Sequence, residues 1–166
     1  MTNTEKGVFY EKGIEFLIRQ NPKIYFDNTR VEWNVKLTGI SGVNHQIDIL
    51  LTTGKMLTLI ECKNHKHPVG VEFVLKMDSI IRDINNSKGA IYSMTGFTPD
   101  AKKYAILKSI ELISMNERDI VFQGCIFALK KCLPNLDDPA QNYCIIMEQL
   151  GNSTTGSYQF QHFESC

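Results

Sequence analysis

The chain has 166 residues, of which 43% are hydrophobic, and this size and composition suffice for one globular domain with a substantial core. Its 18 Lys and Arg residues balance 18 Asp and Glu residues, so the zero net charge excludes a whole-protein field that attracts nucleic acid or an anionic membrane. No apolar run approaches the roughly 18 residues of a spanning helix, which predicts no membrane partner. The five cysteines form no CxxC pair and no signal peptide is recognisable, which favours a cytoplasmic protein.

The first half of the sequence predicts one helix followed by strands. Apolar residues recur at roughly helical spacing until Pro22, and the helix ends there because the residue before a proline avoids the helical conformation. Alternating apolar and polar residues then indicate half-buried strands, two of them joined by a Gly54-Lys55 turn that suits a type II′ hairpin. The predicted elements are a helix from Thr4 to Gln20, a β-rich stretch from Lys23 to Phe26, and strands over Arg30 to Leu37, Gln46 to Thr52 and Met56 to Lys63.

The second half predicts helices that alternate with strands, so that part of the sheet is parallel and covered by helices. Thr98 supplies a capping hydroxyl and Pro99 a helix-compatible first position, which together predict the start of a helix. The fold class is therefore α/β, with a mixed central sheet flanked by helices. The predicted elements are a helix over Glu72 to Ile84, a strand over Gly89 to Met94, a helix from Thr98, a strand over Glu111 to Ser114, and strands over Asp119 to Leu129 and Asn142 to Leu150.

Two carboxylates are predicted to face one another on the hairpin. A turn centred between Gly54 and Lys55 places Asp48 directly opposite Glu61, where like charges are destabilising. Since the flanking residues are largely apolar, the pair needs a cation or a shared proton. Lys63, two residues beyond Glu61 and on the same face, supplies one positive charge. A divalent metal would supply the remainder, and a set of oxygen ligands suits Mg²⁺ (or Mn²⁺) better than zinc.

Such a group of side chains predicts phosphodiester hydrolysis. The metal would lower the pKa of a bound water and neutralise charge on the scissile phosphate. Lys63 would orient or deprotonate that water and stabilise the developing negative charge. A bare pair of acids with a following lysine is also common on ordinary strand surfaces, so the hairpin register and the apolar flanks are what favour a catalytic interpretation.

The segments Gln46-Ile47-Asp48 and Ile60-Glu61-Cys62-Lys63 match the D…ExK core of the PD-(D/E)xK nuclease superfamily. The wider pattern, from Gly7 to Ser114, resembles the Mrr-type restriction endonucleases and includes Gly96-Phe97-Thr98. The resemblance implies a restriction-endonuclease-like fold, Mg²⁺-dependent DNA cleavage and frequent homodimers. Residues 1–116 would then form the nuclease core. Residues 117–166 lie outside the resemblance and are predicted to be a C-terminal β-rich extension of the same domain, with an edge extension, a dimer arm and a DNA-reading element as open alternatives.

The resemblance also implies further site residues. It places a metal-binding glutamate on the first helix, where Glu11 is the better match and Glu15, one turn later, is the alternative. An ordinary solvent-exposed helix glutamate is an equally open interpretation of Glu11. The family often carries a glutamine on the helix after the ExK strand, but Glu72 to Ile84 contains none, so Lys76 or no residue takes that place.

The loop that follows Lys63 is predicted to contact DNA phosphates through His65, Lys66 and His67, with a plain solvated loop as the alternative. Two histidines without a third ligand are a weak zinc signal. Cys62 is predicted to be a core thiol rather than a nucleophile. Core positions are also expected for Trp33, Phe73 and Phe97.

The sequence leaves two other functions open. One is a nuclease-fold module that binds DNA or a protein without cutting. The other is a related enzyme of a different substrate class, such as a structure-specific resolvase or an RNA nuclease, because recognition resides in loops that a single sequence does not define.

Overall fold

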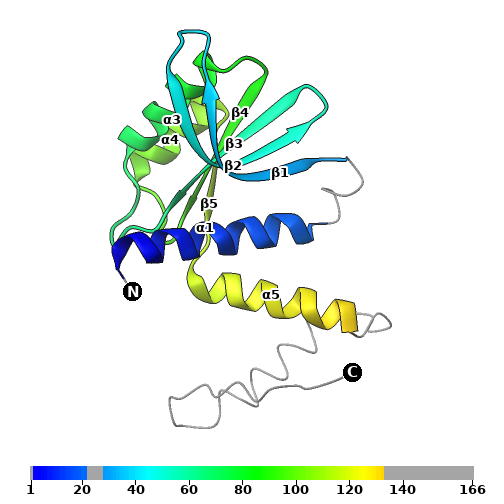
Figure 1. Ribbon diagram of the computed structural model, residues 1–166. Helices are drawn as coiled ribbons and strands as arrows, with labels where there is room; N and C mark the ends of the chain where they lie inside the picture. Colours follow the sequence, from blue (N-terminus) through cyan, green and yellow to red (C-terminus); the bar gives the residue numbers. More distant parts are fainter. Residues whose placement is uncertain (1, 22–27, 133–166) are drawn as a thin grey trace. The chain divides into compact units, whose positions relative to one another are not determined.

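The computed structural model describes residues 2–21 and 28–132. The chain divides into two compact units, residues 1–120 and 121–166, and the fold below is that of the first. Among the described residues, no helix is long and apolar enough to cross a membrane. The elements in chain order are α1 (Asn3–Gln20), β1 (Arg30–Thr38), β2 (Asn44–Thr53), β3 (Met56–Lys63), α3 (Val71–Asp83), β4 (Ser87–Ser93), α4 (Pro99–Lys108), β5 (Glu111–Ser114) and α5 (Glu117–Cys132) (Figure 1).

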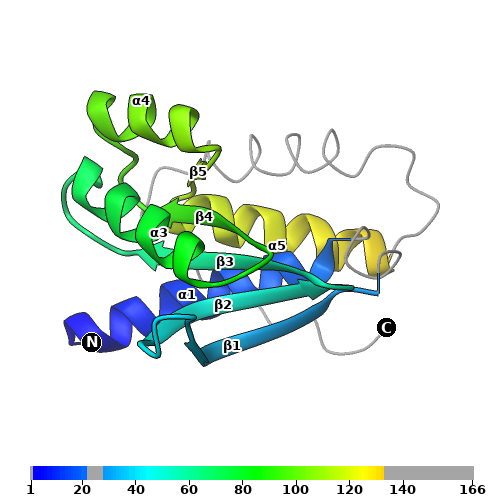
Figure 2. The ribbon, with the colours of Figure 1, turned by 90° about the horizontal axis from the view of Figure 1, so that it is seen from above.

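Five strands form one sheet in the order β1-β2-β3-β4-β5. The first three are antiparallel neighbours, whereas β3, β4 and β5 are parallel and joined through α3 and α4. Figures 1 and 2 show α1 on one side of the sheet and α3 with α4 on the other. The predicted α/β class and mixed central sheet are confirmed.

Two hydrophobic cores hold these layers together. The α3 side packs Val74, Met77 and Ala101 against the sheet, and the α1 side packs Tyr10 and Ile14 against it. Each fully buried large aliphatic side chain contributes about 1.5–3 kcal/mol to folding. Core positions are confirmed for Phe97 and for Cys62, which is 7% exposed, whereas Trp33 and Phe73 are only partly buried at the edges of the two cores.

Local signals explain where most elements begin and end. Thr2 caps α1 through a reciprocal capping box with Glu5. Thr98 caps α4 by accepting the N–H of Ala101, as predicted. Gly54 adopts a φ of 59°, the conformation that a type II′ hairpin requires of its first central residue. Short-range chemistry of this kind is why the predicted boundaries agree with the structure to within a few residues.

The hairpin of β1 and β2 bends at Asp48. The pairing of β2 with β3 stops at Ile49 and Ile60, while β2 remains paired with β1 to its end. At the bend, Asn34 and Asp48 do not pair, and Asn34 has a left-handed φ of 57°. Ile49 packs in the α1-side core but Ile47, two residues away, packs in the α3-side core, whereas such residues share a face in a regular strand. Asp48 therefore lies where β2 separates from β3.

The predicted strand over Asp119 to Leu129 is wrong, because these residues lie in helix α5. Asn116 accepts the N–H of Asp119 through its side chain at 3.0 Å, and Asp119 accepts the N–H of Asn116 at 2.9 Å. This reciprocal cap satisfies backbone donors that a helix start leaves free, and it outweighs the β-rich composition that follows. The predicted β character of the C-terminal extension is thus contradicted over Glu117–Cys132. Lys23 to Phe26 and Asn142 to Leu150 lie outside the described residues.

Candidate active site

Asp48 and Glu61 meet at the point where β2 leaves β3. The hairpin ladder has the predicted register, which continues by one step to place Asp48 opposite Glu61. Asp48 Oδ2 accepts the backbone N–H of Cys62 at 2.7 Å, so a carboxylate replaces a strand partner at the end of the ladder. Lys63 Nζ donates to Glu61 Oε1, and Lys76 Nζ lies 3.9 Å from the same oxygen. The structure thus gathers two acids and two lysines in one place.

The environment of Asp48 disfavours its charge. Burial raises the pKa of its carboxyl to about 6, the negative charge of Glu61 adds to the rise, and the Cys62 N–H partly offsets both effects. The negative charge of Glu11 raises this pKa further, while Lys63 lowers it. An acid with so perturbed a pKa, beside a second acid and a lysine, is typical of a functional site.

Glu11 and Glu15 occupy different environments although they are one turn apart on α1. Burial raises the pKa of Glu11, the indole N–H of Trp33, which donates to its carboxylate at 3.2 Å, lowers it, and the nearby charge of Glu61 raises it. Glu15 is ion-paired with Lys12 and Arg19, each at 2.8 Å, and these bonds lower the pKa of Glu15 although burial acts in the opposite direction. Glu11 therefore belongs electrostatically to the group around Asp48, and Glu15 does not.

The four residues expected to bind DNA lie at different distances from the paired acids. His65 is exposed and packs edge-on against Phe73, with ring centroids 5.2 Å apart, and Lys63 Nζ lies 5.2 Å from the same Phe73 ring. Lys76 is 62% exposed and reaches towards Glu61. Lys66 and His67 are exposed, and the carbonyl of His67 accepts a hydrogen bond from Thr95 at 2.7 Å. His65 and Lys76 thus flank the paired acids, whereas Lys66 and His67 lie on the adjoining loop.

Comparison with known proteins identifies the family. A family model for the Mrr catalytic domain, described as a restriction endonuclease, matches residues 12–118, which is more than half of the chain. The chain belongs to this Mrr restriction endonuclease family. The expected resemblance and the restriction-endonuclease-like fold are therefore confirmed. No curated protein matches the chain.

Solved structures share the fold of this Mrr-family chain. AF1548, a protein of unknown function, is 22% identical with a TM-score of 0.55, covering 70% of this chain and 66% of its own. Can2 from Sulfobacillus thermosulfidooxidans, solved with cyclic tetra-adenylate, is 23% identical (TM-score 0.56; 75% and 35%). VC1899 from Vibrio cholerae is 17% identical (TM-score 0.56; 75% and 34%). This chain spans about a third of the last two proteins, and identities this low show the shared fold alone.

The donor set of this Mrr-family chain fits a hard divalent cation. Among residues 2–21 and 28–132, no group of three His, Cys, Asp or Glu side chains converges into a ready metal cage. Asp48 and Glu61 supply two carboxylates, and Mg²⁺ is commonly held by one or two carboxylates with waters and substrate phosphate filling its other positions. Burial and the neighbouring carboxylates raise the pKa of the Cys62 thiol, so it stays protonated and is a poor ligand or nucleophile.

Two features of the site were absent from the sequence-based expectations. One is the bond from Trp33 to Glu11, with Lys12 Nζ placed 3.7 Å from the centroid of the Trp33 ring. The other is the bend at Asp48, where the ladder between β2 and β3 ends and the Asp48 carboxylate accepts the N–H of Cys62. Asn34 is a sequence signal for the bend, because asparagine tolerates the left-handed conformation, in which Asn34 has a φ of 57°.

Proposed function

We propose that this chain is a Mg²⁺- or Mn²⁺-dependent endonuclease that hydrolyses DNA phosphodiester bonds as a restriction or repair enzyme. The observation that carries the proposal is the convergence of Asp48 and Glu61 at the separation of β2 from β3, with Lys63 bonded to Glu61. Membership of a restriction endonuclease family supports the same chemistry. Glu11, whose pKa is raised by the nearby charge of Glu61, is proposed as an additional metal-binding or positioning carboxylate.

Each residue has a separate task in this proposal. When bound by Asp48 and Glu61, a divalent cation would neutralise charge on the scissile phosphate and acidify the attacking water. Lys63, fixed by Glu61 and 17% exposed, orients that water and stabilises the negative charge that develops on the phosphate oxygens. Lys76 adds an exposed ammonium beside the same carboxylate, and His65 with Lys66 and His67 offers donors to neighbouring phosphates.

Nicking of supercoiled plasmid DNA tests the proposal. With Mg²⁺ or Mn²⁺ and a panel of plasmids that includes methylated DNA, the wild type should convert supercoiled to open-circular DNA. Asp48→Ala and Lys63→Ala should each lower this rate by about 100-fold or more, because the first removes a proposed ligand of the divalent cation and the second removes the positive charge beside the reacting phosphate. Circular dichroism checks that both variants fold, and wild-type nicking rates in either folded variant would refute the site.

Glu11→Gln and Glu15→Gln form a matched pair, since both remove one charge from the same helix. Glu11→Gln should weaken Mn²⁺ binding in calorimetry and slow nicking. Glu15→Gln should leave both unchanged and lower the melting temperature, because the pairs with Lys12 and Arg19 are lost. Equal effects of the two substitutions on Mn²⁺ binding would exclude the proposed role of Glu11.

We also propose that the enzyme works as a homodimer, because cutting both strands of a duplex with one site per chain is simplest in a C2 dimer. Sedimentation velocity with duplex DNA measures the assembly, and purely monomeric complexes would contradict it. If the wild type binds duplex DNA but shows neither Mn²⁺ affinity nor chelator-sensitive nicking, the chain is instead a DNA-binding module.

A further inference from the structure

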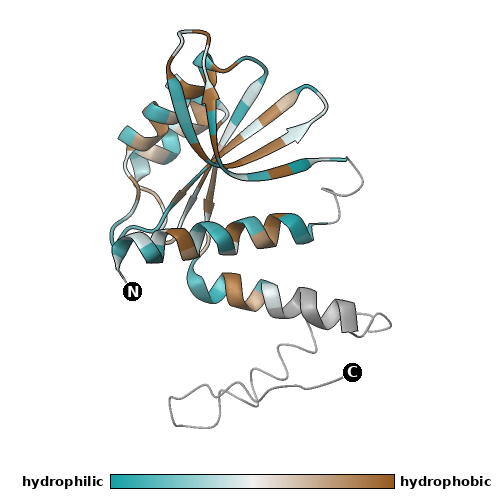
Figure 3. Ribbon diagram, viewed as in Figure 1, coloured by the Kyte–Doolittle hydropathy of each residue, from teal (hydrophilic) through white to brown (hydrophobic). Residues whose placement is uncertain are grey.

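The β1–β2 hairpin has two distinct faces beyond its bend. Val35, Leu37 and Ile47 point towards α3 and pack in the core on that side. Figure 3 shows hydrophilic positions next to these hydrophobic ones along the hairpin, at the top of the view. The other face, here called the ribbon face, is made of four exposed residues, Lys36, Thr38, Asn44 and Gln46, which are paired across the two strands.

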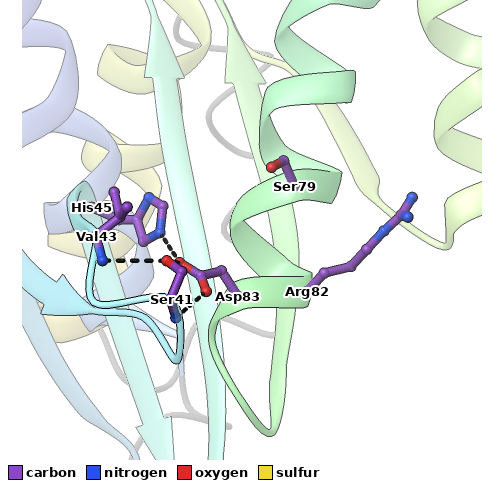
Figure 4. A pocket seen from close by; sticks show the side chains of 6 residues that line it. All are labelled: Ser41, Val43, His45, Ser79, Arg82 and Asp83. Carbon is purple, nitrogen blue, oxygen red and sulfur yellow. Dashed lines mark hydrogen bonds and ion pairs between the residues drawn. The ribbon is translucent and has the colours of Figure 1, made fainter.

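The hairpin is held on α3 by a clasp centred on Asp83. Its carboxylate accepts hydrogen bonds from the N–H of Ser41 at 2.8 Å and the hydroxyl of Ser41 at 2.7 Å, and it pairs with His45 Nε2 at 2.6 Å (Figure 4). The hydrogen bonds from His45 and Ser41 lower the pKa of Asp83 to about 2. A cavity of about 440 Å³ lies here, lined by residues of the hairpin and of α3 that include this clasp. The clasp fixes the inner side of the hairpin and leaves the ribbon face outward.

Hydrogen bonds orient the side chains of the ribbon face, one of them within the face and one to the neighbouring Asn34. Gln46 Nε2 donates to Asn34 Oδ1 at 2.6 Å, and the hydroxyl of Thr38 donates to Asn44 Oδ1 at 2.8 Å. The face carries amides, a hydroxyl and the ammonium of Lys36, and none of its four residues is acidic. It therefore presents hydrogen-bond donors and acceptors with one positive charge on a two-stranded support.

We propose that the ribbon face enters the major groove of duplex DNA beside the phosphate that is cut; this inference rests on the proposed function. A two-stranded ribbon fits the major groove, and asparagine and glutamine are the side chains that bind adenine edges there. Lys36 complements the phosphates. Gln46 is two residues from Asp48 along β2, so the ribbon face begins close to the bend that carries the proposed catalytic carboxylate.

The length of the ribbon face sets how much DNA it covers. At about 3.3 Å per residue, Asn44 lies about 13 Å along β2 from Asp48. With bases spaced about 3.4 Å apart along a strand, this distance corresponds to about four base pairs. Base contacts should therefore be confined to about four base pairs on one side of the nick. A merely solvated face of an amphipathic hairpin predicts no such footprint.

The test measures binding of full-length protein to duplex DNA by fluorescence anisotropy, with Ca²⁺ in place of Mg²⁺ to prevent cutting. The double variant Asn44→Ala/Gln46→Ala should raise the Kd for duplex DNA by about tenfold or more, since amide contacts with bases are lost. Lys36→Glu should also raise this Kd strongly. Lys88→Glu makes the same charge reversal at an exposed residue of β4 and should change the Kd by less than about twofold. Melting temperatures and amide exchange verify that the hairpin stays folded.

Protection of guanine N7 from dimethyl sulfate locates the contact in the major groove. The wild type should protect guanines within about four base pairs of the nick, and Asn44→Ala/Gln46→Ala should lose that protection. If all variants bind duplex DNA as the wild type does while plasmid nicking persists, the ribbon face is only solvated and the proposed function stands. If nicking is absent but the variants still lose duplex binding, the ribbon face stands and the nuclease proposal fails. Absence of duplex binding by the wild type, or preference for single strands or RNA, overturns the inference.

Discussion

Asp48 is the residue on which folding and the proposed chemistry make opposite demands. Chemistry needs its carboxylate ionised, but burial and the charge of Glu61 raise its pKa to about 6. The folded chain therefore binds a proton at this carboxyl more tightly than the unfolded chain does. The stabilising effect of that proton is complete below the ordinary pKa of 3.8 and is lost as the pH rises through about 6.

Asp48→Asn should consequently stabilise the metal-free protein at pH 8, because asparagine keeps the shape and can still accept the N–H of Cys62. A shift from 3.8 to about 6 corresponds to an upper limit of about 3 kcal/mol in the free energy of unfolding. Urea unfolding in EDTA should show the gain at pH 8 and little difference at pH 4. A variant less stable than the wild type at pH 8 would contradict this electrostatic account. Mn²⁺ should then stabilise the wild type but not the variant.

The β1–β2 hairpin is the element that shapes the site, since its bend separates β2 from β3 at Asp48. The position of this hairpin on α3 requires the backbone of Gly39 to lie close to the carboxylate of Asp83 in the clasp. A Cβ added at Gly39 would lie 1.9 Å from Asp83 Oδ2, a distance at which the carboxylate or the loop must move. By contrast, a Cβ added at Gly7 on α1 meets no atom within 4 Å.

Gly39→Ala should therefore lower the melting temperature and speed amide exchange over residues 40–46, because the bonds of Asp83 to Ser41 and His45 break. Gly7→Ala should raise the free energy of unfolding by about 0.5–1 kcal/mol, as alanine is the better helix former. Both substitutions restrict the unfolded chain alike, so the contrast isolates the collision with Asp83. A Gly39→Ala protein as stable as Gly7→Ala would show that the clasp does not constrain the hairpin.

At the scale of the whole molecule, zero net charge limits how DNA can be bound. Among the described residues, the cations that the two proposals assign to DNA are Lys36, Lys63, Lys66 and Lys76, so about four phosphates are expected to be neutralised. Since each contributes about 0.9 to the slope of log affinity against log salt, a slope of about −3 to −4 is expected. Anisotropy titrations from low to physiological NaCl measure it. A slope near −8 would require a basic surface beyond these residues.

Much of the fold follows from the sequence because its signals are local. The cap at Thr98, the turn at Gly54 and the alternation in β1 each act over a few residues, and the elements they predict are present. Lys12 and Arg19 stand at helical spacing from Glu15 in the sequence, so the ion pairs that they form with it also follow from local spacing, although Glu15 itself is buried. Helix α5 shows that local signals can conflict, since its composition predicts a strand whereas the reciprocal cap of Asn116 and Asp119 favours the start of a helix.

The sequence by itself determined the order of the elements from α1 to β5 and the register that places Asp48 opposite Glu61, because propensity and turn geometry depend on neighbouring residues. Only the tertiary structure decided that β2 leaves β3 at this pair and that Glu11 lies close enough to Glu61 for its pKa to be raised by that charge. Both outcomes depend on contacts between residues distant in the chain, Ile47 with the α3-side core and Trp33 with Glu11. Local propensities do not distinguish between these arrangements of the strands and of α1, and the long-range packing contacts select one of them.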